Sequence, residues 1–115
     1  MERGRRLVSA GTGRFIKVGR VSEIPSGRPE VFEVEDRHIA IYHLEDGYYA
    51  IEDICTHDGG PLAEGEVEGR EVICPRHGAR FDIKTGAVRS MPAITPVEAY
   101  PVRVEGDDLL VGLPD

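Results

Sequence analysis

Two short segments of the chain each place a cysteine close to a histidine. The first segment contains Cys55 and His57, and the second contains Cys74 and His77. Sixteen residues separate the two segments, and glycine follows the histidine in each. Thiolates and imidazoles are common ligands of transition metals. The repeated pattern predicts two turns that direct two sulfur and two nitrogen ligands to a common point.

Three interpretations compete for these four side chains: a structural zinc site, a disulfide with bystander histidines, and a 2Fe-2S cluster. Structural zinc sites usually take cysteine pairs about 2–4 residues apart and histidine pairs about 3–5 apart. Here each segment mixes the two residue types, which disfavours zinc. A diiron cluster is wider than one ion, so each loop can supply a ligand to both irons. The spacing favours the cluster, with zinc and the disulfide as alternatives.

The double motif, with its glycines and Pro75, resembles that of the Rieske iron-sulfur family. The resemblance extends over nearly the whole chain. It implies that the two cysteines bind one iron of a single Rieske-type 2Fe-2S cluster and that the two histidines bind the other. It also implies a set of residues that shield and surround the cluster, namely Gly60, Pro61, Leu62, Pro75, Gly78, Ala79, Phe81 and Pro92.

The chain departs from the respiratory branch of that family. In that branch each loop has a further cysteine, the two forming a disulfide, and a serine and a tyrosine follow the second loop. The corresponding positions here hold Gly60, Arg76, Ala79 and Phe81. We therefore expect no disulfide between the loops and fewer hydrogen bonds to sulfur. Because such bonds stabilise the added electron, we expect a reduction potential near the low end of the Rieske range, at roughly −150 mV.

Charged residues flank both loops. Asp53 and Asp58 lie beside the first loop without a partner carboxylate that would indicate acid-base catalysis. Arg76 and Arg80 lie beside the second loop, where we expect solvated side chains, with contact to an acidic partner as the alternative.

Length and charge limit the class of protein. The chain has 115 residues and a net charge of −7, although residues 1–20 carry a local charge of +5. The acidic body argues against a nucleic-acid partner and suits transient contact with a basic protein. Apolar runs are far shorter than the roughly 18 residues of a membrane span, and only two cysteines are present. We expect a soluble, cytoplasmic protein with no membrane contact.

Alternation of apolar residues at a period of two predicts an all-β fold. Expected strands before the first loop cover residues 15–18, 31–34, 39–44 and 48–51, with one helical turn at 21–24. Short strands at 71–73, 79–82 and 87–88 interrupt a region rich in glycine and proline. A terminal hairpin formed by 99–104 and 109–113 is expected to close the same sheet as the early strands.

These elements predict a Rieske-like fold with an antiparallel β base and an inserted cluster-binding lobe. We expect a single Rieske 2Fe-2S domain over residues 1–115, with the lobe at about 52–92. The base would comprise 14–51 and 93–113, and residues 1–13 would form a basic arm. Apolar alternation in 52–92 is too weak to stabilise the lobe alone, so a further cross-link is expected.

The resemblance implies a one-electron carrier of the small soluble ferredoxin type, not an enzyme. Electrons would pass from a reductase to an acceptor such as a ring-hydroxylating dioxygenase. We expect a monomer with transient interfaces under about 1,200 Å² and no catalytic residues. The alternatives are a small or regulatory subunit of a nitrite reductase-type complex and a zinc-stapled binding module.

Overall fold

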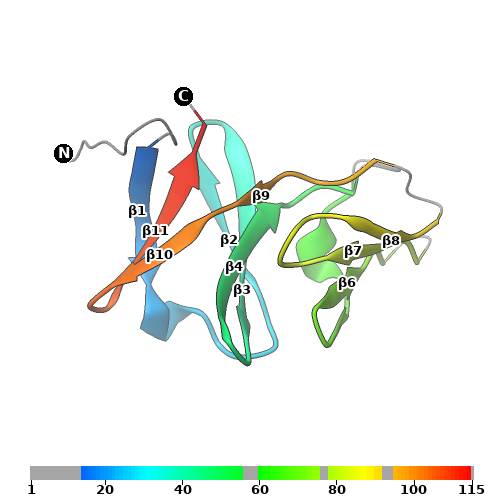
Figure 1. Ribbon diagram of the computed structural model, residues 1–115, viewed down its shortest axis with the longest axis horizontal. Coiled ribbons are helices and arrows are strands. Elements are labelled where there is room, and N and C mark those ends of the chain that lie inside the picture. The colour runs from blue at the N-terminus through cyan, green and yellow to red at the C-terminus, as the bar shows by residue number, and fades with distance from the viewer. Residues whose placement is uncertain (1–13, 56–59, 76–77, 92–94, 115) are drawn as a thin grey trace.

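The computed structural model describes residues 14–55, 60–75, 78–91 and 95–114 (Figure 1). Within these residues the chain forms three antiparallel sheets and two short 3-10 helices. The all-β prediction is therefore confirmed. The same residues contain no helix that is long and apolar enough to cross a membrane.

The two ends of the described chain form the first sheet of the base. Its strands are β1 (Arg14–Arg20), β10 (Val102–Glu105) and β11 (Asp108–Leu113), in the order β1-β11-β10. β10 and β11 form the predicted terminal hairpin, and Gly106 in their turn has a φ of +64°, which suits glycine.

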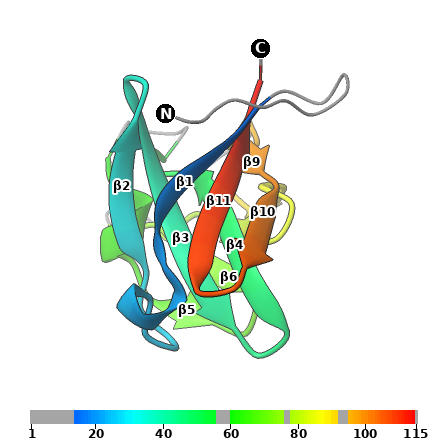
Figure 2. The ribbon, with the colours of Figure 1, turned by 90° about the vertical axis from the view of Figure 1, so that its left-hand side faces the viewer.

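The second sheet of the base contains β2 (Glu30–Val34), β3 (Arg37–Leu44), β4 (Gly47–Glu52) and β9 (Ala99–Tyr100). These strands lie in the order β2-β3-β4-β9. The first sheet lies across one face of the second (Figure 2). The 3-10 helix η1 (Val21–Glu23) follows β1, in agreement with the helical turn predicted there.

The terminal hairpin pairs with β1, as predicted. The prediction that residues 99–104 form one strand, in a single sheet with all the early strands, is wrong. The chain changes sheet at Pro101, because residues 99 and 100 pair with β4 whereas Val102 pairs with β11. Proline lacks the N–H that a continuous ladder requires. The carbonyl of Pro101 accepts a hydrogen bond from the N–H of Gly112 at 2.9 Å. The terminal hairpin thus closes the first sheet, and the base consists of two sheets.

The third sheet forms a lobe between β4 and β9 in the chain (Figure 1). Its strands are β5 (Val67–Glu68), β6 (Glu71–Ile73), β7 (Arg80–Asp82) and β8 (Val88–Ser90), in sequence order. The 3-10 helix η2 (Leu62–Glu64) precedes them. Neither β5 nor η2 was predicted, because both lie in a segment of glycines and glutamates with little apolar alternation.

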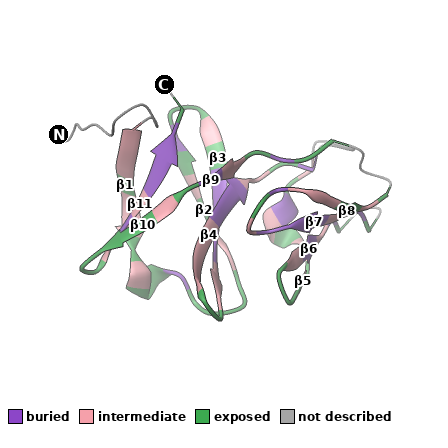
Figure 3. Cartoon of the chain, viewed as in Figure 1, coloured by how far each residue is buried: buried purple, intermediate pink, exposed green. Residues whose placement is uncertain are grey.

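Apolar burial joins the lobe to the base. Alternate residues of β3 face opposite sides, so Ile39 and Ile41 belong to the core of the base whereas Ala40 and Tyr42 belong to the core of the lobe. The lobe adds Leu62, Phe81 and other fully buried side chains to this second core (Figure 3). The lobe therefore obtains from the base the apolar contact that its own sequence lacks.

Candidate metal centre

Two loops of the lobe carry the predicted ligands, and both are closed by the same backbone bond. The N–H of Cys55 donates to the carbonyl of Gly60 at 2.7 Å, and the N–H of Cys74 donates to the carbonyl of Ala79 at 2.7 Å. Each bond spans five residues. The similarity predicted from sequence between the two half-motifs thus extends to the backbone geometry at the mouth of each loop.

Both cysteines lie inside the core of the lobe. Cys55 is fully buried and Cys74 is 1% exposed, and neither forms a disulfide. Leu62 and Phe81 belong to the same buried core. Sulfur ligands in such a place are shielded from water, and a bound metal ion would hold them as thiolates.

The remaining predicted ligands, His57 and His77, lie outside the described residues, as does Pro92. Consequently, the residues described here contain no group of three or more metal-binding side chains. The chemistry of the described donors nevertheless fits a 2Fe-2S cluster, because two buried thiols occupy matching loops. Open space beside Gly78, whose φ is +79°, also leaves room at the second loop.

The residues predicted to surround the cluster divide into an inner and an outer group. Leu62, Ala79 and Phe81 are fully buried and pack in the lobe core. Gly60 is half-buried. Pro61, Pro75 and Gly78 are exposed. The inner group excludes water from the cysteines, whereas the outer group lies at the surface of the loops. Their contacts with a cluster stay a prediction.

A close backbone approach joins the segments that carry the two loops. Gly65 ends η2 and packs so tightly on the end of β6 that a Cβ there would lie 1.8 Å from the carbonyl oxygen of Ile73. The N–H of Ile73 donates to the carbonyl of Glu66 at 2.9 Å. Only glycine permits this approach. The exit of the first loop is therefore fixed against the strand that leads to Cys74.

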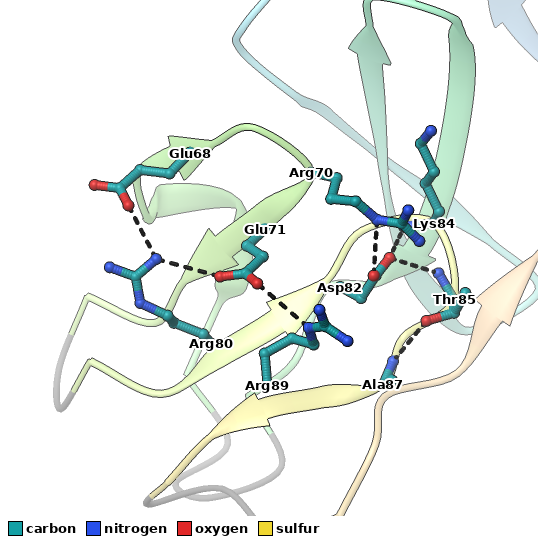
Figure 4. Close-up of polar contacts among 9 residues, drawn as sticks. All are labelled: Glu68, Arg70, Glu71, Arg80, Asp82, Lys84, Thr85, Ala87 and Arg89. Atoms are coloured by element: carbon teal, nitrogen blue, oxygen red, sulfur yellow. Dashed lines mark hydrogen bonds and ion pairs between the residues drawn. The ribbon is translucent and has the colours of Figure 1, made fainter.

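A buried carboxylate organises the turn between β7 and β8. Arg70 Nε donates to Asp82 at 2.9 Å, and the N–H groups of Lys84 and Thr85 donate to it at 2.8 and 3.2 Å (Figure 4). Burial acts to raise the pKa of Asp82, but these hydrogen bonds outweigh burial and hold the pKa below its usual value. Asp82 is thus an ionised structural residue.

The prediction that Arg80 is simply solvated is wrong. Arg80 pairs with Glu68 at 2.9 Å and with Glu71 at 3.3 Å, and Glu71 also pairs with Arg89 at 3.3 Å (Figure 4). These acidic residues on neighbouring strands neutralise the Arg80 charge, so Arg80 offers little attraction to an acidic partner. Arg76 lies outside the described residues.

The sequence did not reveal the structural role of Asp53. Its carboxylate accepts a hydrogen bond from the N–H of Ala63 at 2.7 Å, across the first loop. The sequence itself shows only an acidic residue two positions before Cys55 and a proline after the first loop. The helix η2, whose N-cap Pro61 forms no side-chain cap, is known from the structure.

Comparison with known proteins supports the fold and the expected type of cofactor. Residues 14–101 match the family described as the Rieske [2Fe-2S] domain. The chain is 35% identical over 102 residues to the ferredoxin component of the naphthalene 1,2-dioxygenase system of Pseudomonas aeruginosa. That alignment covers 89% of this chain and 98% of the relative.

Solved structures give the same answer for the fold. The ferredoxin of carbazole 1,9a-dioxygenase from Nocardioides aromaticivorans IC177 is similar with a TM-score of 0.81 and 33% identity, over 85% of this chain and 96% of that chain. A ferredoxin in a complex of reduced oxygenase and oxidised ferredoxin of carbazole 1,9a-dioxygenase is similar with a TM-score of 0.79. Its identity is 32%, over 85% of this chain and 92% of that one. The expected architecture of an antiparallel base with an inserted lobe is therefore confirmed.

Proposed function

The chain belongs to the Rieske [2Fe-2S] domain family, and from this premise we propose that its cluster is held by Cys55, His57, Cys74 and His77. The two cysteines bind one iron and the two histidines bind the other. The observation that supports this assignment is that both cysteines are buried in one core and begin loops closed by the same backbone bond. When bound, the cluster accepts and releases one electron at a time.

The protein is an electron carrier and not an enzyme. Its relatives are ferredoxin components of dioxygenase systems, and it matches them over nearly their full length. It carries electrons from a reductase to an acceptor enzyme, and the acceptor we propose is a ring-hydroxylating oxygenase. The similar ferredoxin in complex with an oxygenase supports this choice of partner.

The chain's own residues have three tasks in electron transfer. The two loops bind and orient the cluster through their matched backbone closures. Leu62 and Phe81 exclude water from the sulfur ligands. The exposed residues Pro61 and Pro75 lie beside the loops, where a partner can approach closely without a large interface.

The remaining expectations also form part of the proposal. Residues 1–115 constitute one Rieske domain, with a cluster-binding lobe at about 52–92, a base at 14–51 and 93–113, and a basic arm at 1–13. We place the protein in the cytoplasm, because a chain with two cysteines is unlike a secreted disulfide scaffold. We also propose that it is a monomer. The presence of all four proposed ligands in the sequence favours the carrier over a nitrite reductase-type small subunit.

Metal and sulfide analysis of anaerobically purified protein tests this function. We expect about two irons and two acid-labile sulfides per chain, as the cluster type requires. The reduced protein should lose its electron to a ring-hydroxylating oxygenase in a stopped-flow experiment. Protein that contains zinc and no sulfide would instead identify the alternative, a binding module with a structural zinc ion. A cluster that no oxygenase reoxidises would contradict the proposed acceptor.

A further inference from the structure

Asp53 joins the two sides of the first metal loop. Its backbone N–H donates to the carbonyl of His38 on β3 at 2.8 Å, which ties the entry of the loop to the base. Its side-chain Oδ1 accepts the N–H of Ala63 at 2.7 Å, beyond the exit of the loop. One residue therefore connects the base, the loop entry and the loop exit.

The start of η2 explains why this bond forms. The first N–H groups of a helix have no partner within the helix, and the side chain at the N-cap position usually accepts one of them. Here Pro61 occupies the N-cap position and forms no side-chain cap. Asp53, ten residues earlier, supplies the missing acceptor to Ala63 in the first turn. A carboxylate acceptor makes this bond stronger than one between neutral groups.

The second loop shares the backbone closure of the first. The N–H of Cys74 bonds to Ala79, and the N–H of Gly78 bonds to the carbonyl of Cys74 at 3.0 Å. Both are bonds between backbone groups. Within the described residues, a side chain bonds across the first metal loop, and that side chain is Asp53. The first loop thus has, in addition to its backbone bond, a closing hydrogen bond to a replaceable side chain.

We propose that Asp53 is a positioning residue for the metal centre. By holding the loop between Cys55 and Gly60 closed, it keeps the first pair of ligands in one geometry while the cluster gains and loses an electron. Residues that orient metal ligands typically change metal affinity about 10- to 100-fold when they are replaced. The inference rests on the proposed ligand set.

Three variants and one control separate the hydrogen bond of Asp53 from its charge. Asp53→Ala removes the acceptor. Asp53→Asn keeps an acceptor oxygen and removes the charge. Glu64→Gln is the matched control, because it removes a carboxylate from the exposed side of η2. Ala63→Pro deletes the donor and leaves the charge of Asp53 in place, and no bond within the helix is lost, because the first N–H groups of a helix have no partner there.

The measurements are cluster loss to a chelator, the EPR spectrum of the reduced protein, and hydrogen exchange at the Ala63 amide. Asp53→Ala and Ala63→Pro should lose the cluster about tenfold faster or more and should show more than one EPR species. Exchange at Ala63 in Asp53→Ala should be about tenfold faster. Asp53→Asn should restore one EPR species, and Glu64→Gln should behave as the wild type.

The outcomes distinguish this inference from the function on which it rests. A wild-type protein without iron and sulfide would overturn both. A normal wild type together with an Asp53→Ala variant of unchanged EPR spectrum and cluster retention would overturn the inference alone, even if Ala63 exchanged faster. If Asp53→Ala does not fold, Ala63→Pro, which lacks the hydrogen bond, is compared with Asp53→Asn, which keeps it. Equal EPR spectra of these two variants would overturn the inference.

Discussion

Ala79 and Phe81 are the individual residues that bear most directly on the reduction potential. Both are fully buried in the core that contains the two cysteines, and neither carries a hydroxyl group. We predict a potential of roughly −150 mV, because fewer hydrogen bonds to sulfur leave the reduced cluster less stabilised. Protein-film voltammetry provides the measurement. A wild-type potential well above zero would contradict this explanation.

Adding one hydroxyl group at this position should raise the potential. In Ala79→Ser we expect an increase of about 40 mV, since one hydrogen bond contributes about 1 kcal/mol and a tenfold change corresponds to about 59 mV for one electron. Ala87→Ser, in the turn before β8, is the matched control and should leave the potential unchanged. Equal potentials in all three proteins would show that no hydrogen bond forms at residue 79.

Tyr42 carries a buried hydroxyl group for which the described residues provide no hydrogen-bond partner. Burial, followed by the charge of Asp53, raises the pKa of Tyr42 well above its usual value, so the side chain stays neutral. Tyr42→Phe should therefore change the free energy of unfolding by less than about 1 kcal/mol, because no bond is lost. Urea unfolding measures this change. A destabilisation of more than about 2 kcal/mol would reveal a partner of the hydroxyl.

At the scale of the elements, the contact between η2 and β6 determines how the two metal loops sit together. Gly65→Ala would place a Cβ against a backbone carbonyl that is unable to move away cheaply. We expect a destabilisation of about 2 kcal/mol or more, measured by urea unfolding, together with faster loss of the cluster. Gly69→Ala is the control. Its φ is +62° in open space, so it should cost only about 1 kcal/mol and leave the cluster in place.

The β7–β8 turn gives the lobe a defined response to acid. The pKa of Asp82 lies below its usual value of 3.8 in the folded protein. Its contribution to stability is therefore present above pH 3.8 and is lost as the pH falls through the lower folded pKa. Asp82→Asn should be less stable than the wild type at neutral pH, and the difference should shrink in strong acid. A difference in stability that does not depend on pH would contradict the ionised state of Asp82 in the turn.

The elements also show what sequence reasoning could and could not reach. Hairpins β2–β3 and β3–β4 were predictable, because apolar alternation and short polar turns are local signals. The change of sheet at Pro101 depends on which strand lies nearby, and the sequence does not record that. The Asp53–Ala63 bond and the ion pairs of Arg80 also join residues that are separated in the chain. Each cysteine lies within three residues of its histidine, and this local pattern allowed the candidate ligands to be named from the sequence.

For the whole molecule, the lobe and the base form one folded unit through β3. Ala40 and Tyr42 face the lobe while Ile39 and Ile41 face the first sheet, so this strand is buried on both sides. We expected a further cross-link to be necessary, but the shared core already supplies apolar cohesion. We predict that metal-free protein keeps its β structure, as circular dichroism can measure. Loss of the strand signal with the metal would contradict this.

The net charge of −7 governs how the whole molecule meets its partners. If a basic oxygenase surface receives the electron, salt screens the attraction and slows association. We predict that the second-order rate constant for oxygenase reoxidation decreases as ionic strength rises. Stopped-flow measurements between about 0.01 and 0.5 M salt span the range in which screening changes most. A rate that increases with salt would contradict a basic partner.

The central claim is that two cysteines and two histidines from matched loops hold one diiron cluster. Electron-nuclear double resonance on reduced protein labelled with ¹⁵N-histidine tests it most directly. The account predicts two strongly coupled histidine nitrogens that disappear from the spectrum when both His57 and His77 are replaced by cysteine. A reduced cluster without coupling to any histidine nitrogen would contradict the account.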